Sequence, residues 1–223
     1  SGLLREIATE KGFPEPLKGA VVLDQPAQRI VALAKLINPK ARKLGTAVNG
    51  SVPNRLSEFE RVVSTQGMQL NAAKLFEDSN PIADLKHIFS DSDVFIVIPD
   101  KSRFNSKIAK WILFLSYRQR VPVIGYSQKY TDAGALVSIF STPQQVGQDT
   151  GKRLIEAFSK GHFHFPIVRL QYPRYFTLSV NDKVANSLGI EIDSAAQLKE
   201  RMRDTYGAKY PSGNNLLLEI VDQ

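Results

Sequence analysis

The feature that most constrains the fold of this chain is a repeated alternation of short apolar segments with amphipathic helical patterns. Residues 94–98 form a continuous run of Val, Phe and Ile, which is typical of a strand covered on both faces. Ile108, Ile112 and Leu115 then recur at helical spacing. Strands that alternate with helices at this pitch predict βαβ units, and therefore an α/β fold with a doubly wound parallel sheet.

The same alternation extends over most of the chain. Further strands are expected at residues 20–23, 44–48, 68–75, 121–125, 135–140, 167–170 and 175–180. Helical spacing predicts a helix after Pro26, and a short helix that Asp182 caps and Gly189 ends. In the helix expected over 143–158, Gly147 and Gly151 stand one turn apart, which predicts a close approach to a neighbouring helix.

Composition narrows the class of protein. The chain has 223 residues, of which 43% are hydrophobic, and no apolar run approaches the roughly 20 residues that cross a bilayer. It begins without a secretory leader, so a mature or truncated form is expected. Cysteine is absent, which excludes a thiol nucleophile and a disulfide. The net charge of +7 is dispersed and lacks any nucleic-acid-binding signature, so no nucleic-acid partner is expected.

Motifs for catalysis are incomplete. Gly147, Gly151 and Lys152 have the wrong spacing for a phosphate-binding loop, and Arg153 stands where Ser or Thr is required. His162 and His164 alternate around a phenylalanine, but no carboxylate lies near them in the sequence to complete a metal site. No Gly-x-Ser-x-Gly elbow exists. We therefore expect a binding protein that is not an enzyme, with no catalytic residues, cofactor or metal.

Polar side chains follow three of the expected strands, at the edge where ligands bind in open parallel sheets. The first segment offers Asn49, Ser51 and Asn54 before a helix whose N–H groups favour an anion such as a carboxylate. Ser51 and Asn54 are the contacts expected there, although Asn54 is equally well explained as a helix cap.

The other two segments offer further contacts. Asp100 and Ser102 follow the strand at 94–98, where Asp100 either holds a ligand amine or is an ordinary turn residue. Ser127 and Tyr130 follow the strand at 121–125. Tyr130 either stacks on an apolar ligand or covers an edge of the core.

From about residue 20 to residue 202 the chain resembles the ABC-type solute-binding proteins, some of which bind aromatic amino acids. Leu23-Asp24-Gln25-Pro26 opens the first matching stretch, and Tyr126-Ser127 stands where many relatives have an acidic residue. The matching stretches, in order, are residues 23–28, 49–54, 97–100, 121–127, 133–136, 141–147, 172–173, 176–181, 184–185 and 188–189.

The resemblance implies a type I periplasmic-binding-protein-like fold of two Rossmann-like lobes joined by a three-stranded hinge, represented here mainly by the C-terminal lobe. Its expected parts are a remnant of the N-terminal lobe with a hinge strand (1–25), the C-terminal lobe (26–134), the returning strand and helix of the N-terminal lobe (135–166), a segment crossing back (167–204) and an unplaced tail (205–223). Only about twenty residues stand where the family's first lobe would precede residue 23.

The resemblance also implies a function: solute binding for an ABC uptake system, in the periplasm or on a lipid anchor outside the cytoplasm. The partners would be a small solute, such as an amino acid, and a membrane permease. Three alternatives stay open. They are a ligand-sensing domain of the same fold, a flavodoxin-like or receiver domain with Asp100 as its acidic residue, and a lobe that pairs with a second copy as a homodimer.

Overall fold

The computed structural model describes residues 19–48, 53–75, 80–99, 106–158 and 169–209. These residues divide into two compact units. The smaller unit consists of residues 19–26, 140–158 and 169–177, and the larger unit takes in the rest. The chain crosses from one unit to the other after Pro26, after Ile139 and after Thr177.

The larger unit is built on one sheet whose neighbouring strands are joined by parallel ladders from β3 across to β6. The ladders align Thr46 with Ile96, and Ile96 with Ile124, across the centre of the sheet. In spatial order the strands are β3 (Gln69–Lys74), β2 (Lys43–Val48), β4 (Val94–Ile96), β5 (Val123–Gly125), β6 (Val137–Phe140) and β8 (Thr177–Val180).

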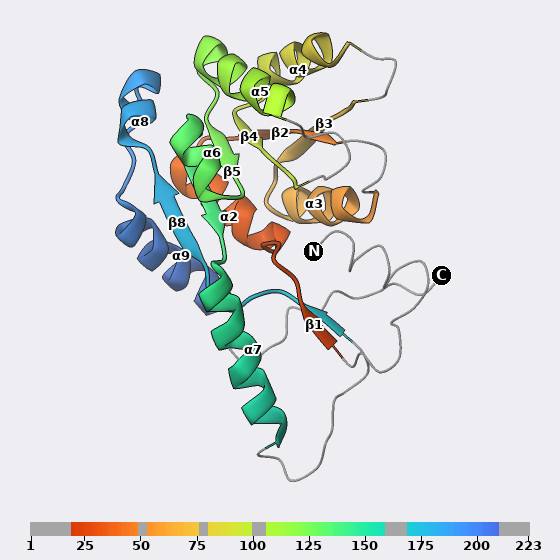
Figure 1. Ribbon diagram of the computed structural model, residues 1–223. Helices are drawn as coiled ribbons and strands as arrows, with labels where there is room; N and C mark the ends of the chain where they lie inside the picture. Colours follow the sequence, from red (N-terminus) through yellow and green to blue (C-terminus); the bar gives the residue numbers. More distant parts are fainter. Residues whose placement is uncertain (1–18, 49–52, 76–79, 100–105, 159–168, 210–223) are drawn as a thin grey trace. The chain divides into compact units, whose positions relative to one another are not determined.

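Helices cover both faces of this sheet. Figure 1 shows α4 (Pro81–Ser90) and α5 (Ser106–Gln119) side by side on one face, and α2 (Ala27–Ile37) with α3 (Pro53–Thr65) on the other. α9 (Ala195–Lys209) packs on α2. This arrangement is the doubly wound α/β fold expected from the sequence.

Two short helices complete the larger unit, α6 (Gln128–Ala133) and α8 (Asp182–Leu188). Asp182 was expected to cap α8, but the cap is Asn181, whose side chain accepts a 3.1 Å hydrogen bond from the Val184 N–H. Asp182 is the first helical residue, where its negative charge suits the helix dipole. Gly189 ends α8 with a φ of 69°, as expected of a left-handed helix stop.

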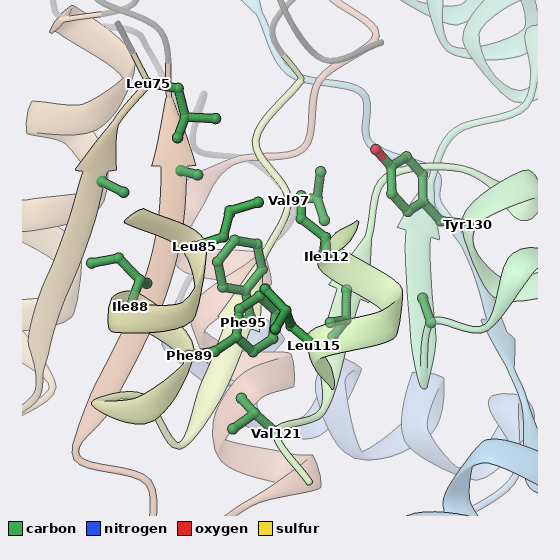
Figure 2. Close-up of a cluster of buried hydrophobic side chains, with 14 residues drawn as sticks. Leu75, Leu85, Ile88, Phe89, Phe95, Val97, Ile112, Leu115, Val121 and Tyr130 are labelled. Atoms are coloured by element: carbon green, nitrogen blue, oxygen red, sulfur yellow. The ribbon is translucent and has the colours of Figure 1, made fainter. Parts of the chain in front are cut away.

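One cluster of the hydrophobic core lies between the sheet and α4 and α5 (Figure 2), and buried side chains of α2 and α3 cover the other face. Phe89 of α4 stacks on Phe95 of β4 with ring centroids 4.4 Å apart and an angle of 8° between the rings. Ile112 and Leu115 of α5 are buried against the same cluster. Burial of aromatic and aliphatic side chains is therefore the main stabilising contribution in this unit.

The smaller unit contains a two-stranded parallel sheet and one long helix. β1 (Gly19–Val21) pairs with β7 (Arg169–Gln171), and α7 spans Pro143–Phe158. The buried carboxylate of Asp149 accepts 2.9 Å from Arg153 Nε and 2.8 Å from the Arg174 N–H. The Arg174 guanidinium also donates two 2.8 Å bonds to Glu156 and holds the pKa of that carboxyl below its usual range.

One observation in α7 differs from the sequence-based expectations. No described atom lies within 4 Å of a Cβ placed on Gly147 or Gly151, so the expected close approach of a helix at these glycines is wrong for the described part of the chain. The strand at 137–140 lies beside β5 in the larger sheet, and the chain enters the smaller unit at Phe140.

The C-terminal tail was expected from about residue 205. Helix α9 extends to Lys209, and residues 210–223 lie outside the described residues. Within the described ranges, no helix has the length and apolar character to cross a membrane.

Candidate functional site

The strand order of the larger unit locates a candidate site. Chain order runs from β2 outward to β3 and then back past β2 to β4, β5 and β6. The direction of winding therefore reverses between β2 and β4. In doubly wound sheets ligands bind outside the carboxyl ends of the strands at such a switch point. Here the chain segments that leave these ends are residues 49–52 after β2 and residues 97–105 after β4.

A third segment follows the carboxyl end of β5, the strand next to β4 in the sheet. Tyr126 and Tyr130 lie there with ring centroids 4.9 Å apart and an angle of 52° between the rings. Tyr130 is 9% exposed and belongs to the hydrophobic cluster in Figure 2. Burial raises the pKa of its phenol above the usual value, and Tyr126 adds to the shift.

Ser127 occupies the residue before α6. Its backbone is extended, with φ −157° and ψ 159°, and its side chain makes no capping hydrogen bond to the helix. The backbone carbonyl of Ser127 accepts a 3.0 Å bond from the Tyr130 N–H, so these two sequence-predicted residues are brought together. The Ser127 side chain is half-buried.

A buried set of polar contacts fixes α6 on the sheet. Thr131 donates from its hydroxyl to Ser138 Oγ of β6 at 2.6 Å, and the Thr131 carbonyl accepts 2.8 Å from Asn181 Nδ2. Gly125 allows this close packing, because a Cβ at that position would stand 2.4 Å from the Tyr130 Cβ. The Tyr130 ring is therefore held in a defined position at the edge of the sheet.

A buried ion pair lies in the first turns of α3. Arg55 Nη1 donates 2.6 Å to Glu58 Oε2, and the Arg55 guanidinium lies over the Phe59 ring at 4.8 Å. The other Glu58 oxygen accepts 3.2 Å from the Ala27 N–H at the start of α2. Arg55 is only 6% exposed. Glu58 thus ties the beginnings of two helices together.

Sequence reasoning did not single out Arg55 or Glu58, and it named Tyr126 only as part of the family resemblance. A signal for the first was available, because an arginine in the first turn of a helix opposes the helix dipole. Such a residue indicates that another group compensates its charge. The compensating carboxylate is one turn farther along the same helix, at a spacing that brings the two side chains together.

The other sequence-predicted contacts are placed only in part. Asn49, Ser51, Asp100 and Ser102 lie outside the described residues. α3 begins at Pro53, so Asn54 lies in the first turn, but its side chain is likewise outside the described part. The strands that the sequence-predicted residues follow in the chain, β2, β4 and β5, are parallel neighbours whose carboxyl ends lie on the same side of the sheet.

A shallow groove of about 450 Å³ lies elsewhere in the larger unit. It is lined by Phe114 and Tyr117 of α5 and by Val184 and Leu188 of α8. The second half of α5 leads to the amino end of β5, so the groove lies at the amino ends of the strands. The three segments follow the carboxyl ends. The groove is not part of the candidate site.

Metal-binding residues do not gather in the described part of the chain, where no three His, Cys, Asp or Glu side chains are grouped to hold an ion. His87 is exposed on α4. His162 and His164 lie outside the described residues.

The comparison with protein families identifies the class of protein that this fold and edge belong to. The model of the ABC transporter substrate binding protein family matches residues 19–200, and the chain belongs to that family. The resemblance drawn from its sequence motifs is thereby confirmed. No curated protein sequence matches the chain.

Solved structures show the same fold. A conserved domain protein from Vibrio cholerae O1 biovar El Tor is 18% identical, covers 86% of this chain and 66% of its own, and has a TM-score of 0.65. An ABC domain from Streptococcus pneumoniae in complex with L-Trp is 17% identical over 81% of this chain and 62% of its own, with a TM-score of 0.60.

A third structure is the ligand-free, open form of a substrate-binding protein with adhesive properties from Clostridium difficile. It is 18% identical, covers 74% of this chain and 55% of its own, and has a TM-score of 0.58. These likenesses confirm the type I periplasmic-binding-protein-like fold. This chain spans less than two thirds of the length of each of the three proteins.

Proposed function

We propose that this chain supplies solute-binding residues to an ABC-type uptake system and holds a small molecule at the carboxyl edge of its parallel sheet. The observation that carries the proposal is the reversal of winding between β2 and β4 in a member of the substrate-binding family. The segments on either side of that reversal contain the polar residues singled out from the sequence. Binding is non-covalent, and no catalytic step is assigned.

The solute that suits these residues is an amino acid, with an aromatic one favoured. Ser51 and Asn54 stand where α3 begins, and N–H groups at a helix start stabilise a carboxylate. Asp100 supplies a negative charge for an amine. Asn49, Ser102 and Ser127 supply further hydrogen-bonding groups around the same edge.

The aromatic preference is supported by the pair of tyrosines after β5. Tyr130 is buried in the core, and its ring supports the half-buried ring of Tyr126 with centroids 4.9 Å apart. A supported and partly exposed aromatic face after β5 favours a flat, apolar partner. A structural neighbour was solved with L-Trp, which is consistent with this preference.

The partner of the loaded protein is an ABC permease, and the working compartment lies outside the cytoplasm, as is usual for the family. Domain closure around the solute would present the loaded form to the permease.

The test is thermal and chemical unfolding with a panel of L-amino acids, nucleosides and small sugars, run on this chain and on the complete natural gene product. A specific solute at about one hundred times its dissociation constant stabilises the folded state by about 2.7 kcal/mol. We expect the largest shift with L-Trp, L-Tyr or L-Phe. A panel that leaves both proteins unshifted would contradict the proposal.

Single substitutions test which side chains contact the solute. Asp100→Asn removes the charge expected to hold the amine, and we expect at least a tenfold weaker affinity measured by calorimetry. Asp182→Asn on exposed α8 is the matched control and should bind as the parent does. Equal affinities for the two variants would remove Asp100 from the site.

A further inference from the structure

The three chain crossings between the compact units have one feature in common. Each crossing has a nearby residue in the smaller unit, and hydrogen bonds join these three residues to one another. Gln25 precedes the first crossing, Ser141 follows the second, and Tyr175 precedes the third. These positions are distant in the sequence, so the contacts between them are set by the fold.

The contacts form a relay through one hydroxyl group. Gln25 Nε2 donates 2.9 Å to Ser141 Oγ, and Ser141 Oγ donates 2.6 Å to the backbone carbonyl of Tyr175. A carbonyl only accepts, so the serine proton must point to Tyr175 and the hydroxyl must accept from Gln25. The Gln25 side chain is 4% exposed, and water competes little for it.

A second set of bonds repeats the link between the last two crossings. Gln145 Oε1 accepts 3.0 Å from the Thr142 N–H and 3.2 Å from Thr177 Oγ1. Thr142 immediately precedes α7 and Gln145 lies in its first turn, and Thr177 is the last residue before the third crossing. The second and third crossings are therefore connected twice.

We propose that Gln25 and Ser141 form a clamp that makes the three crossing segments move as one body at the edge of the smaller unit. Any bending between the units is then confined to the backbone next to the clamp, after Pro26, Ile139 and Thr177. Both residues are positioning residues and touch no solute. The clamp deepens the proposed function, because it sets the motion on which solute capture rests, but its test needs no solute.

The test measures the distribution of distances between the two units. The chain has no cysteine, so two introduced cysteines are its only thiol labelling sites. Lys110 of α5 and Ile155 of α7 are exposed and belong to different units. Spin labels at Lys110→Cys and Ile155→Cys, read by pulsed dipolar spectroscopy without solute, report how widely the units move.

Three variants and a control decide the result. Ser141→Ala removes the relay, and Gln25→Glu keeps the size of the side chain but replaces the donor with an acceptor. We expect both to broaden the distance distribution, and Ser141→Thr, which keeps the hydroxyl, to restore the parent width. Ser64→Ala, which removes a comparable 2.9 Å hydroxyl bond to Arg61 within α3, should leave the width unchanged.

Distributions of parent width in both Ser141→Ala and Gln25→Glu would overturn the clamp. A loss of folding in Ser141→Ala, seen as a lost melting transition, leaves Gln25→Glu to decide alone. Broadening in the variants together with an unshifted solute panel would keep the clamp and reject the proposed function. Parent widths together with a solute-induced shift would do the reverse.

Discussion

The larger unit buries aromatic and aliphatic side chains between a parallel sheet and its helices, whereas the described part of the smaller unit contains a network of charged and polar side chains around a buried carboxylate. Phe89, Phe95 and Ile112 are almost fully buried in the first. In the second, the most buried side chain of α7 is the Asp149 carboxylate, while Ile155 is 69% exposed. Helix α7 therefore has a buried carboxylate and an exposed isoleucine, whereas α4 and α5 bury their apolar side chains.

The difference teaches what each unit needs to remain folded. A sheet with helices on both faces excludes water and gains stability in proportion to the apolar area buried. The described part of the smaller unit adds hydrogen bonds and ion pairs around Asp149, and the net contribution of each such bond is smaller. Mutations of the two kinds of contact should therefore differ in size and in where their effects are felt.

The largest effect is expected from the apolar core. Phe95→Ala leaves a cavity beside Phe89 in a site that is closed to solvent, and should lower the free energy of unfolding by about 3–5 kcal/mol. Urea unfolding followed by circular dichroism measures the change. A cost below about 1 kcal/mol would show that this cluster does not dominate the stability of the larger unit.

A smaller and more local effect is expected from the ionic network. Asp149→Asn keeps the shape but turns one acceptor into a donor that faces the donors of Arg153 and Arg174. Because the Arg174 side chain is 36% exposed and reaches water, we expect a cost of about 1–3 kcal/mol. Hydrogen exchange should accelerate roughly tenfold or more in α7.

Helix α5 is the internal control for that experiment, and its exchange should stay at the parent rate. Asp182→Asn, an exposed substitution of the same kind on α8, should change neither helix. Equal acceleration in α5 and α7 would mean that the two units unfold together, and the comparison between them would lose its energetic meaning.

Sequence reasoning predicted the larger unit well because its signals are local. Continuous β-branched runs and helical spacing identify β4 and α5. The order of the strands in the sheet was not predicted and comes from the structure. The edge that carries the candidate site follows from the same order. The cap of α8 was misplaced by one residue, because Asn181 and Asp182 are both good caps and only the backbone geometry separates them.

The contacts that sequence reasoning did not reach join residues distant in the chain. Glu58 meets the Ala27 N–H across two helices, and Gln25 meets Ser141 across more than half of the chain. Pairings of this kind depend on the finished fold and leave no periodic pattern. The glycines of α7 show the converse case, because Gly147 and Gly151 have a pattern typical of helix contact and no described neighbour fills the space.

The smallest effect on stability is expected at an exposed isoleucine of α7, which can be compared with a buried isoleucine of α5. Ile112 in α5 is 0% exposed and Ile155 in α7 is 69% exposed. Ile112→Ala should cost about 2–5 kcal/mol through the lost burial and the cavity. Ile155→Ala loses little contact and gains slightly in helix propensity, so its unfolding free energy should change by less than about 0.5 kcal/mol.

Paired urea titrations of the two variants measure this difference, and the complete natural gene product provides a second background. If Ile155→Ala costs more than about 1 kcal/mol only in the complete product, other parts of that protein cover the apolar side of α7. If it costs as much in this chain, the side chain is buried in solution and α7 does not present an open apolar side. Either result would mean that Ile155 of α7 is covered in that protein, and the contrast between the two units would be smaller than the structure indicates.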